Sequence, residues 1–333
     1  MIIPDISILI VAYNSDMKVF SRCLKAISRL KRDNLNVEVL LIDNNSRPAL
    51  SVYPQVQQFL QECPNSRILV ETKQGSGYAR ICGFHAAAAP LIVTFDDDNE
   101  PEENYLLGVK NFFEKNPELG VAGPGIIKVD YFEGCPAYFE KFRYVFQEVR
   151  SEKEEITRSQ WPDKAYPYGT GMAMRKNVAI DYSRKVESGQ FSSIGRINNI
   201  LTSGEDMQLV WNCLKNSEFA VGVSPSIQLR HLIGRNKANF NYWRKLSFGG
   251  GYSWATTRME IFPEELPTIQ NTAREIRKSF FRIAKVFVFN FYRPRFFIIS
   301  LASQVGVLHG IYRINRKAPP FFLNVLKSIL RVD

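Results

Sequence analysis

The sequence contains few cysteines, and those that it has are scattered. There are five in 333 residues, and no two of them form a C-x-x-C pair. An odd, dispersed set argues against a disulfide framework and against a structural zinc site, so it favours a reducing compartment. The five are Cys23, Cys63, Cys82, Cys135 and Cys213.

The N-terminus lacks the pattern of a secretory leader. A leader combines a basic segment, a long apolar run and a small-residue cleavage site. Here Ile6–Tyr13 (ISILIVAY) already has the pattern of a buried strand. We therefore expect the chain to stay in the cytoplasm.

Two common nucleotide-binding loops are also missing. Gly75-Ser76-Gly77 is not followed by the Gly-Lys-Ser/Thr of a phosphate-binding NTPase loop. It does not complete G-x-G-x-x-G either, because Arg80 occupies the third glycine position. The sequence thus argues against an NTPase and against a dinucleotide-dependent dehydrogenase.

Excess positive charge is absent from most of the chain. The formal net charge is +10, but residues 271–333 hold twelve Lys and Arg against two acids, so the remainder is neutral. These cations alternate with Phe, Ile, Val and Leu, a mixture that suits a lipid interface better than a nucleic acid. Phe296–Tyr312 is slightly shorter than the roughly 20 apolar residues of a spanning helix. The sequence predicts an in-plane anchor on anionic lipid, and no nucleic-acid partner.

What is present over the first hundred residues is an alternation of apolar strand patterns with helical patterns. This predicts an α/β protein with a mostly parallel sheet flanked by helices and joined by right-handed crossovers. Further along we expect helices near 102–116 and 205–216, and a solvated helix or loop at 150–155. The predicted strands are Ile6–Tyr13, Val37–Asp43, Ile68–Glu71 and Leu91–Phe95.

Polar residues follow three of these strands. Asn14 follows the first, Asp43 ends the second, and Asp96-Asp97-Asp98 follows the fourth. Ligands of open parallel sheets bind at the carboxyl ends of the strands. We therefore expect one crevice to collect these side chains.

The acidic triplet indicates a cation. Neighbouring carboxylates repel one another unless positive charge neutralises them. Mg²⁺ takes one or two carboxylates together with substrate phosphate oxygens. An acidic surface turn is the alternative, but the position directly after a buried strand and before Pro101 favours a metal site.

Two further motifs each allow two interpretations. Glu205-Asp206 precedes a helical run, where a carboxylate is either a simple cap or a general base. His231 ends a strand-like run near Arg230, Arg235 and Lys237. It is either a packed core residue or a metal ligand, with the cations beside it holding a diphosphate.

Together these motifs resemble glycosyltransferase family 2, the inverting transferases with the GT-A fold. The resemblance covers roughly Ile6 to His231, with a weaker similarity to Ala255. It rests on five motifs in the family order: Val11-Ala12-Tyr13-Asn14, Leu41-Ile42-Asp43-Asn44-Asn45-Ser46, Gly75 to Arg80, Asp96-Asp97-Asp98 with Pro101, and Gly204-Glu205-Asp206.

The resemblance implies roles for the donor site. Asp43 contacts the nucleotide base, and Ala12 and Asn14 line the same pocket. Arg80 is the donor-binding cation. The D-x-D pair is Asp96 and Asp98, with Asp97 in the variable middle position of the donor site.

It also implies the catalytic and metal residues. Asp206 is the catalytic base, beside Glu205. His231 joins Asp96 and Asp98 in holding Mg²⁺ or Mn²⁺. Tyr168–Met172 lines the donor sugar and acceptor region, and Trp161 either stacks on an acceptor sugar or packs inside.

The chain departs from the family pattern at three places. Asp43-Asn44-Asn45-Ser46 replaces the usual Asp-Asp-Gly-Ser. This version is similar to the motif of the rhamnosyltransferase-like, polysaccharide branch of the family. Ile81 stands where the family has an asparagine. The Q-x-x-R-W motif of processive synthases is missing at Asn241–Arg244, so addition of a single sugar is expected.

The predicted protein is therefore an inverting, metal-dependent glycosyltransferase of cell-surface polysaccharide or glycolipid synthesis. It would use a UDP- or dTDP-sugar and a saccharide or lipid-linked acceptor, on the inner face of the cell membrane. The expected parts are a nucleotide-sugar half (1–100), an acceptor half (101–265) and a basic helical region (266–333). The alternatives are a sugar nucleotidyltransferase and a catalytically inactive protein that binds carbohydrate or membrane.

Overall fold

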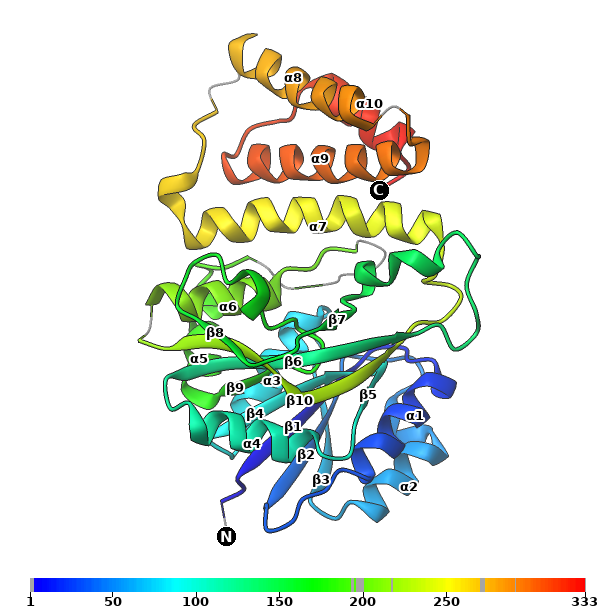
Figure 1. Ribbon diagram of the computed structural model, residues 1–333, viewed down its shortest axis with the longest axis vertical. Coiled ribbons are helices and arrows are strands. Elements are labelled where there is room, and N and C mark those ends of the chain that lie inside the picture. Colours follow the sequence, from blue (N-terminus) through cyan, green and yellow to red (C-terminus); the bar gives the residue numbers. More distant parts are fainter. Residues whose placement is uncertain are drawn as a thin grey trace. The chain divides into compact units, whose positions relative to one another are not determined.

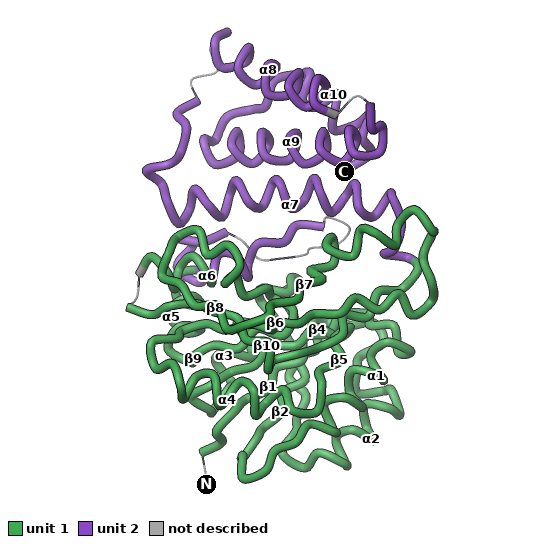
Figure 2. The backbone as a smooth tube through the Cα atoms, viewed as in Figure 1, with its two compact units in different colours: residues 1–185, 209–235 green, residues 186–208, 236–333 purple. Residues whose placement is uncertain are grey.

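The computed structural model describes residues 3–192, 195, 201–216, 218–269, 273–290 and 292–332 (Figure 1). The chain forms two compact units, coloured separately in Figure 2. The sheet unit contains residues 1–185 and 209–235, and the helical unit contains 186–208 and 236–333. The two units are defined by the contacts within each of them. The expected boundaries at residues 100 and 265 separate functional parts, so they stay a prediction.

The sheet unit begins with four parallel strands in the order β3-β2-β1-β4. Every residue of β1 (Ile6–Ala12) and β2 (Val37–Asp43) is buried, as expected for apolar strands covered on both faces. This confirms the predicted parallel half of the sheet. The other elements here are β3 (Ser66–Val70), β4 (Leu91–Asp96), α1 (Met17–Ser28), η1 (Leu50–Val52), α2 (Pro54–Glu62) and α3 (Ser76–Ala86).

The second half of the sheet is mixed. β6 pairs in parallel with β10, and β9 joins β4 to β6 through antiparallel pairing on both sides. The helix expected near 102–116 is present as α4 (Tyr105–Lys115). The remaining strands are β5 (Asn99–Pro101), β6 (Leu119–Asp130), β7 (Val149–Arg150), β8 (Glu155–Thr157), β9 (Ala173–Arg175) and β10 (Ala220–Leu232).

The charged stretch 150–155 differs in part from the expectation. Residues 151–154 form a loop, but both ends enter short strands. Arg150 pairs with Ile126 of β6, and Glu155 pairs with Val223 of β10. Backbone pairing with long neighbouring strands outweighs the low strand propensity of the charged side chains.

The core of the sheet unit lies between the sheet and α1, α2 and α4. Phe20 and Ile27 of α1, Phe59 of α2 and Phe112 of α4 belong to one buried cluster with the strand residues. Three short 3-10 or helical segments complete the connections of this unit. They are η2 (Glu140–Phe146), η3 (Asp163–Ala165) and α5 (Lys176–Glu187), whose last two residues belong to the helical unit.

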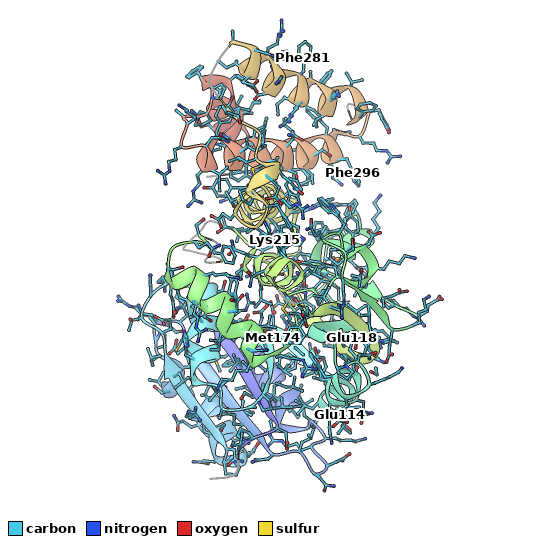
Figure 3. The ribbon with its side chains drawn as sticks, turned by 90° about the vertical axis from the view of Figure 1, so that its left-hand side faces the viewer. Glu114, Glu118, Met174, Lys215, Phe281 and Phe296 are labelled. Atoms are coloured by element: carbon cyan, nitrogen blue, oxygen red, sulfur yellow. The ribbon has the colours of Figure 1, made fainter. Side chains whose placement is uncertain are left out.

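The helical unit contains the first turn of α6 (Glu205–Asn216) and a layered set of helices. α9 lies between α7 on one side and α8 and α10 on the other (Figures 1 and 3). Phe296 of α9 contacts Trp243 of α7, with ring centroids 6.0 Å apart. The helices are α7 (Phe240–Ile261), η4 (Pro263–Glu265), α8 (Ala273–Asn290), α9 (Pro294–Ile314) and α10 (Phe321–Ile329).

Glycines allow α7 and α9 to pack backbone against backbone. A Cβ atom on Gly251 would overlap the carbonyl oxygen of Ser303, and one on Gly306 would overlap the carbonyl oxygen of Phe248. Gly250, one residue away, faces open space, where a Cβ would meet no atom within 4 Å. The contact therefore depends on which side of α7 a glycine occupies.

This difference predicts opposite effects of the same substitution. Gly251→Ala should destabilise the protein by about 1–3 kcal/mol, because the helices must separate or strain. Gly250→Ala should stabilise it by up to about 1 kcal/mol, because alanine is the better helix former. Urea unfolding followed by circular dichroism measures both free energies. Equal effects at the two positions would contradict the close α7–α9 contact.

By length and composition, α9 is long and apolar enough to cross a membrane. Half of its apolar stretch, however, is buried inside the protein. Ala302, Val305 and Leu308 are fully or almost fully buried. A core helix of a soluble protein passes the same test, so the packing of α9 has to be weighed against its composition.

Candidate functional site

The carboxyl ends of β1, β2 and β4 lie level with one another. Ala12 pairs with Asp43, and Val11 pairs with Asp96. The segments that follow these strands therefore leave the sheet at the same edge. The register of β1 with β2 and β4 therefore places the polar residues at the ends of these strands near one another, as predicted.

Asp43 organises the loop that follows β2. One carboxylate oxygen accepts the backbone N–H of Ser46 at 2.8 Å, and the other accepts that of Leu50 at 2.9 Å. The side chain is 2% exposed. Each oxygen retains a second lone pair for a hydrogen bond from a ligand. This loop-holding contact was not foreseen from the sequence.

Ala12 and Asn14 lie against the same loop. The Ala12 carbonyl accepts from Asn44 N–H at 2.9 Å, and Asn14 Oδ1 accepts from Arg47 N–H at 2.8 Å. Asn14 N–H donates to Ser46 Oγ at 3.0 Å. The structure thus brings together the three residues predicted to line the base pocket.

Asn44 explains one departure from the family pattern. Its Nδ2 donates to the carbonyls of Glu71 (3.1 Å) and Lys73 (2.7 Å), and its Oδ1 accepts from Gly75 N–H at 2.9 Å. An amide can donate and accept at once, whereas an aspartate at this position could only accept. Asn44 therefore joins the loop after β2 to the start of α3. Gly75 itself has φ +138°, a conformation that favours glycine.

The three consecutive aspartates have different partners. Asp96 Oδ1 accepts from Arg80 Nη2 at 2.8 Å, and Asp97 Oδ2 accepts from Ser15 Oγ. Asp98 is 7% exposed, and its Oδ1 lies 3.5 Å from His231 Nε2. The triplet thus divides into separate contacts.

The structure places Arg80 where it orients a carboxylate. Its side chain is 13% exposed and comes from the second turn of α3, which begins after Gly75, beside the loop that follows β2. The ion pair turns the Asp96 carboxylate toward α3. The predicted D-x-D pair therefore has Asp96 beside a cation and Asp98 beside an imidazole.

His231 reaches Asp98 through strand pairing. It lies opposite Asn99 in the antiparallel β5–β10 pair, and Leu232 N–H donates to the Asp98 carbonyl at 2.8 Å. His231 Nδ1 lies 2.9 Å from the Phe146 carbonyl. Because a carbonyl only accepts, Nδ1 carries the proton, and in the neutral ring the Nε2 lone pair faces Asp98.

This pair of donor atoms fits a hard divalent cation. A neutral imidazole whose other nitrogen donates to a carbonyl is the usual arrangement of a metal-binding histidine. Oδ1 of Asp98, which lies 3.5 Å from Nε2, would be the second ligand atom of such an ion. Among the described residues, no group of three or more His, Cys, Asp or Glu is close enough to form a site from protein ligands alone. Water and substrate oxygens would therefore complete the Mg²⁺ or Mn²⁺ shell.

The aspartates affect the pKa of a buried thiol, that of Cys23. Cys23 on α1 is completely buried, and its Sγ donates to the Asp96 carbonyl at 3.6 Å. Burial, followed by the charges of Asp97 and Asp98, raises the pKa of Cys23 well above its usual value. The aspartates therefore create a negative potential at this edge, which attracts cations.

Arg230 does not accompany His231. Successive residues of a strand point to opposite faces, and Arg230 lies 3.6 Å from Glu100 and 3.5 Å from Glu102. Arg22 adds a two-pronged bond to Glu100, at 3.2 and 2.8 Å. Strand alternation thus turns Arg230 toward these acids and away from His231. The diphosphate contact of the cations Arg230, Arg235 and Lys237 stays a prediction.

The segment 168–172 packs against β4. Gly171 has φ +74°, and a Cβ there would overlap Leu229. Thr94 N–H donates to the Met172 carbonyl at 2.8 Å, and Tyr105 Oη donates to the Gly171 carbonyl. Most of the predicted sugar-lining segment is thus buried. Trp161, in contrast, is 58% exposed, so the packed alternative for this side chain is wrong.

Glu205 and Asp206 belong to the helical unit, where α7 holds the segment around them. Ser203 N–H donates to Ser253 Oγ at 3.1 Å, and Gln208 Nε2 donates to Glu260 Oε2 at 2.6 Å. Asp206 is half-buried, and its Oδ1 accepts from Met207 N–H at 2.8 Å. Local sequence patterns could not identify Ser253 and Glu260, because about fifty residues separate them from the motif.

Residues 7–183 match the family model described as glycosyl transferase family 2. No curated protein matches the chain. One of the solved structures that match the chain is the crystal structure of S. aureus TarS, with 12% sequence identity and a TM-score of 0.49. The alignment covers 98% of this chain, which spans about half (52%) of the TarS chain.

Proposed function

The chain belongs to glycosyltransferase family 2, and from this premise we propose that it adds a single sugar to an acceptor hydroxyl with inversion. The proposed donor is a UDP- or dTDP-sugar. The proposed acceptor is a saccharide or lipid-linked saccharide of cell-surface polysaccharide or glycolipid synthesis. The observation that carries the proposal is the facing of Asp98 and His231 at the strand-end edge where Asp43 organises its loop.

The proposed reaction is one displacement at the anomeric carbon. Asp206 takes the proton of the acceptor hydroxyl as its oxygen bonds to that carbon. The bond from the carbon to the diphosphate oxygen breaks on the opposite side, so the configuration inverts. Asp96, Asp98 and His231 would hold the divalent ion, which would supply positive charge to the departing diphosphate.

The remaining residues prepare the site. We propose that the nucleotide base binds to Asp43, Ala12 and Asn14. The loop after β2 is already held in place by hydrogen bonds to these residues. Arg80 is proposed to bind the donor beside Asp96, with which it forms an ion pair. Groups held in place before binding lose little freedom when the substrate arrives.

A donor screen tests this function. UDP-, dTDP- and GDP-sugars are incubated with the protein and Mn²⁺, and release of nucleoside diphosphate is measured. One donor should bind and undergo slow hydrolysis, and transfer should follow when a matching acceptor is added. Release of pyrophosphate instead would identify a nucleotidyltransferase. Failure of every donor to bind would favour the inactive binding protein.

We further propose that the enzyme works on the cytoplasmic face of the cell membrane through residues 271–333. The twelve cations of this region against two acids support it. Deleting the region is not a suitable test, because α9 covers the glycine face of α7, and α7 holds the segment around Asp206. Surface substitutions that leave the helices packed are required instead.

A further inference from the structure

The outer helices of the helical unit expose apolar side chains in regular stripes. On α8, Ile276, Phe280 and Phe287 lie on one side, at spacings of four and seven residues. The two phenylalanines are each 57% exposed, even though they contact Phe322 and Phe297.

α10 repeats the pattern. Phe321, Val325 and Ile329 follow one another at four-residue spacing and are 83%, 37% and 70% exposed. We call these six residues of α8 and α10 the apolar stripe. Exposed apolar side chains repeated along one side of a helix are typical of an interaction surface.

The side chains of the apolar stripe are not the part of α8 and α10 that packs against the rest of the helical unit. Both helices are already packed on another side: Ser279 of α8 and Leu323 of α10 are buried. Leu323 belongs to a cluster with Leu308 and Tyr312 of α9. Phe281, which points away from α9, is itself 58% exposed (Figure 3).

α8 also carries exposed cations, most of them on other sides of the helix than the apolar stripe. Five lie on this helix, against the single acid Glu275, which pairs with Lys278 at 2.8 Å. Phospholipids with anionic head groups complement both features, because the cations meet phosphate while the aromatic rings enter the acyl boundary. The five are Arg274, Arg277, Lys278, Arg282 and Lys285.

α9 is placed to support this surface and not to cross the bilayer. Protein covers it on both sides: Gly306 and Gly310 abut the α7 backbone, and Leu308 packs with α10 residue Leu323. A spanning helix would have to leave both neighbours and expose the α7 glycines.

We propose that the apolar stripe of α8 and α10 lies in the head-group region of an anionic phospholipid bilayer, with α9 inside the helical unit. The proposal deepens the membrane placement and rests on it. It assigns the attachment to two helices lying in the plane of the membrane, held by shallow aromatic insertion and by phosphate contacts.

Vesicle flotation of the full chain tests the proposal. The protein should float with vesicles of phosphatidylcholine and phosphatidylglycerol, but not with phosphatidylcholine alone, and high salt should weaken the association. Phe280→Ser with Phe287→Ser should weaken partitioning about 100-fold, because two aromatic side chains no longer enter the lipid. Val52→Ser with Val70→Ser, which changes two valines of the sheet unit that are 61% and 60% exposed, should have no effect.

Three results would overturn the proposal. The first is an equal loss of vesicle binding in both double variants. The second is binding to single-stranded RNA in place of vesicles. The third is retention in membranes after alkaline carbonate extraction, which would indicate that α9 spans the bilayer. Donor hydrolysis without vesicles is measured on the same samples. A variant that hydrolyses donor but does not float separates this surface from the transfer reaction, and a wild type that floats without hydrolysing any donor contradicts the proposed function alone.

Discussion

Asp206→Asn should reduce sugar transfer by about 100- to 10,000-fold, the range that general-base catalysis contributes. The amide keeps the size of the side chain and can still accept from Met207 N–H, which Asp206 Oδ1 does at 2.8 Å. It cannot take a proton from the acceptor hydroxyl. Donor binding should remain normal, because the substitution leaves the strand-end residues unchanged.

The matched control is Asp16→Asn. Asp16 also begins a helix, and its Oδ1 accepts from Lys18 N–H at 2.9 Å. Asparagine is an equally good cap, so this variant should transfer at the normal rate. Initial rates of acceptor glycosylation and donor titrations measure the two effects separately. Near-normal transfer by Asp206→Asn would remove this residue from the role of base.

Asp98→Ala should lower metal-dependent donor cleavage by about 100-fold or more, because a bound metal contributes several kcal/mol of charge stabilisation. It removes the carboxylate that faces His231 Nε2 at 3.5 Å. A titration of activity with Mn²⁺ should show a weaker apparent affinity for the ion. His231→Gln should shift the same titration in the same direction.

Asp33→Asn is the control for this series. Asp33 is exposed in a turn with φ +42°, a conformation that asparagine adopts readily. Its variant should match the wild type in both rate and metal dependence. If Asp98→Ala instead cleaves the donor at the wild-type rate and with the wild-type dependence on Mn²⁺, this carboxylate holds no ion.

Much of the fold followed from local patterns. The β-branched runs of β1 and β2 are recognisable because strands buried on both faces need apolar side chains at every position. Parallel pairing then places their polar ends at one edge, which is why Asp43 and Asp96 could be grouped before any coordinates. The expected helices at 102–116 and 205–216 are present for the same reason, since their apolar spacing is local.

The hydrogen-bond and ion-pair partners of the site residues could not be predicted from local sequence patterns. Nothing near Asp43 in the sequence shows that both of its oxygens hold a loop. The proton position on His231 is set by the Phe146 carbonyl, 85 residues away. Arg230 and His231 are adjacent in the chain, yet strand alternation sends them to opposite faces. These facts depend on side-chain direction and on contacts between distant segments.

The sequence by itself determined the family, the order of the strands and helices in its first half, and the basic, apolar character of the C-terminal region. Those properties are encoded residue by residue, in composition and short motifs. Only the tertiary structure decided that α9 packs against α7 and α10, and that α7 holds the segment around Asp206. Burial and long-range hydrogen bonds belong to pairs of segments, so they exist only once the chain has folded.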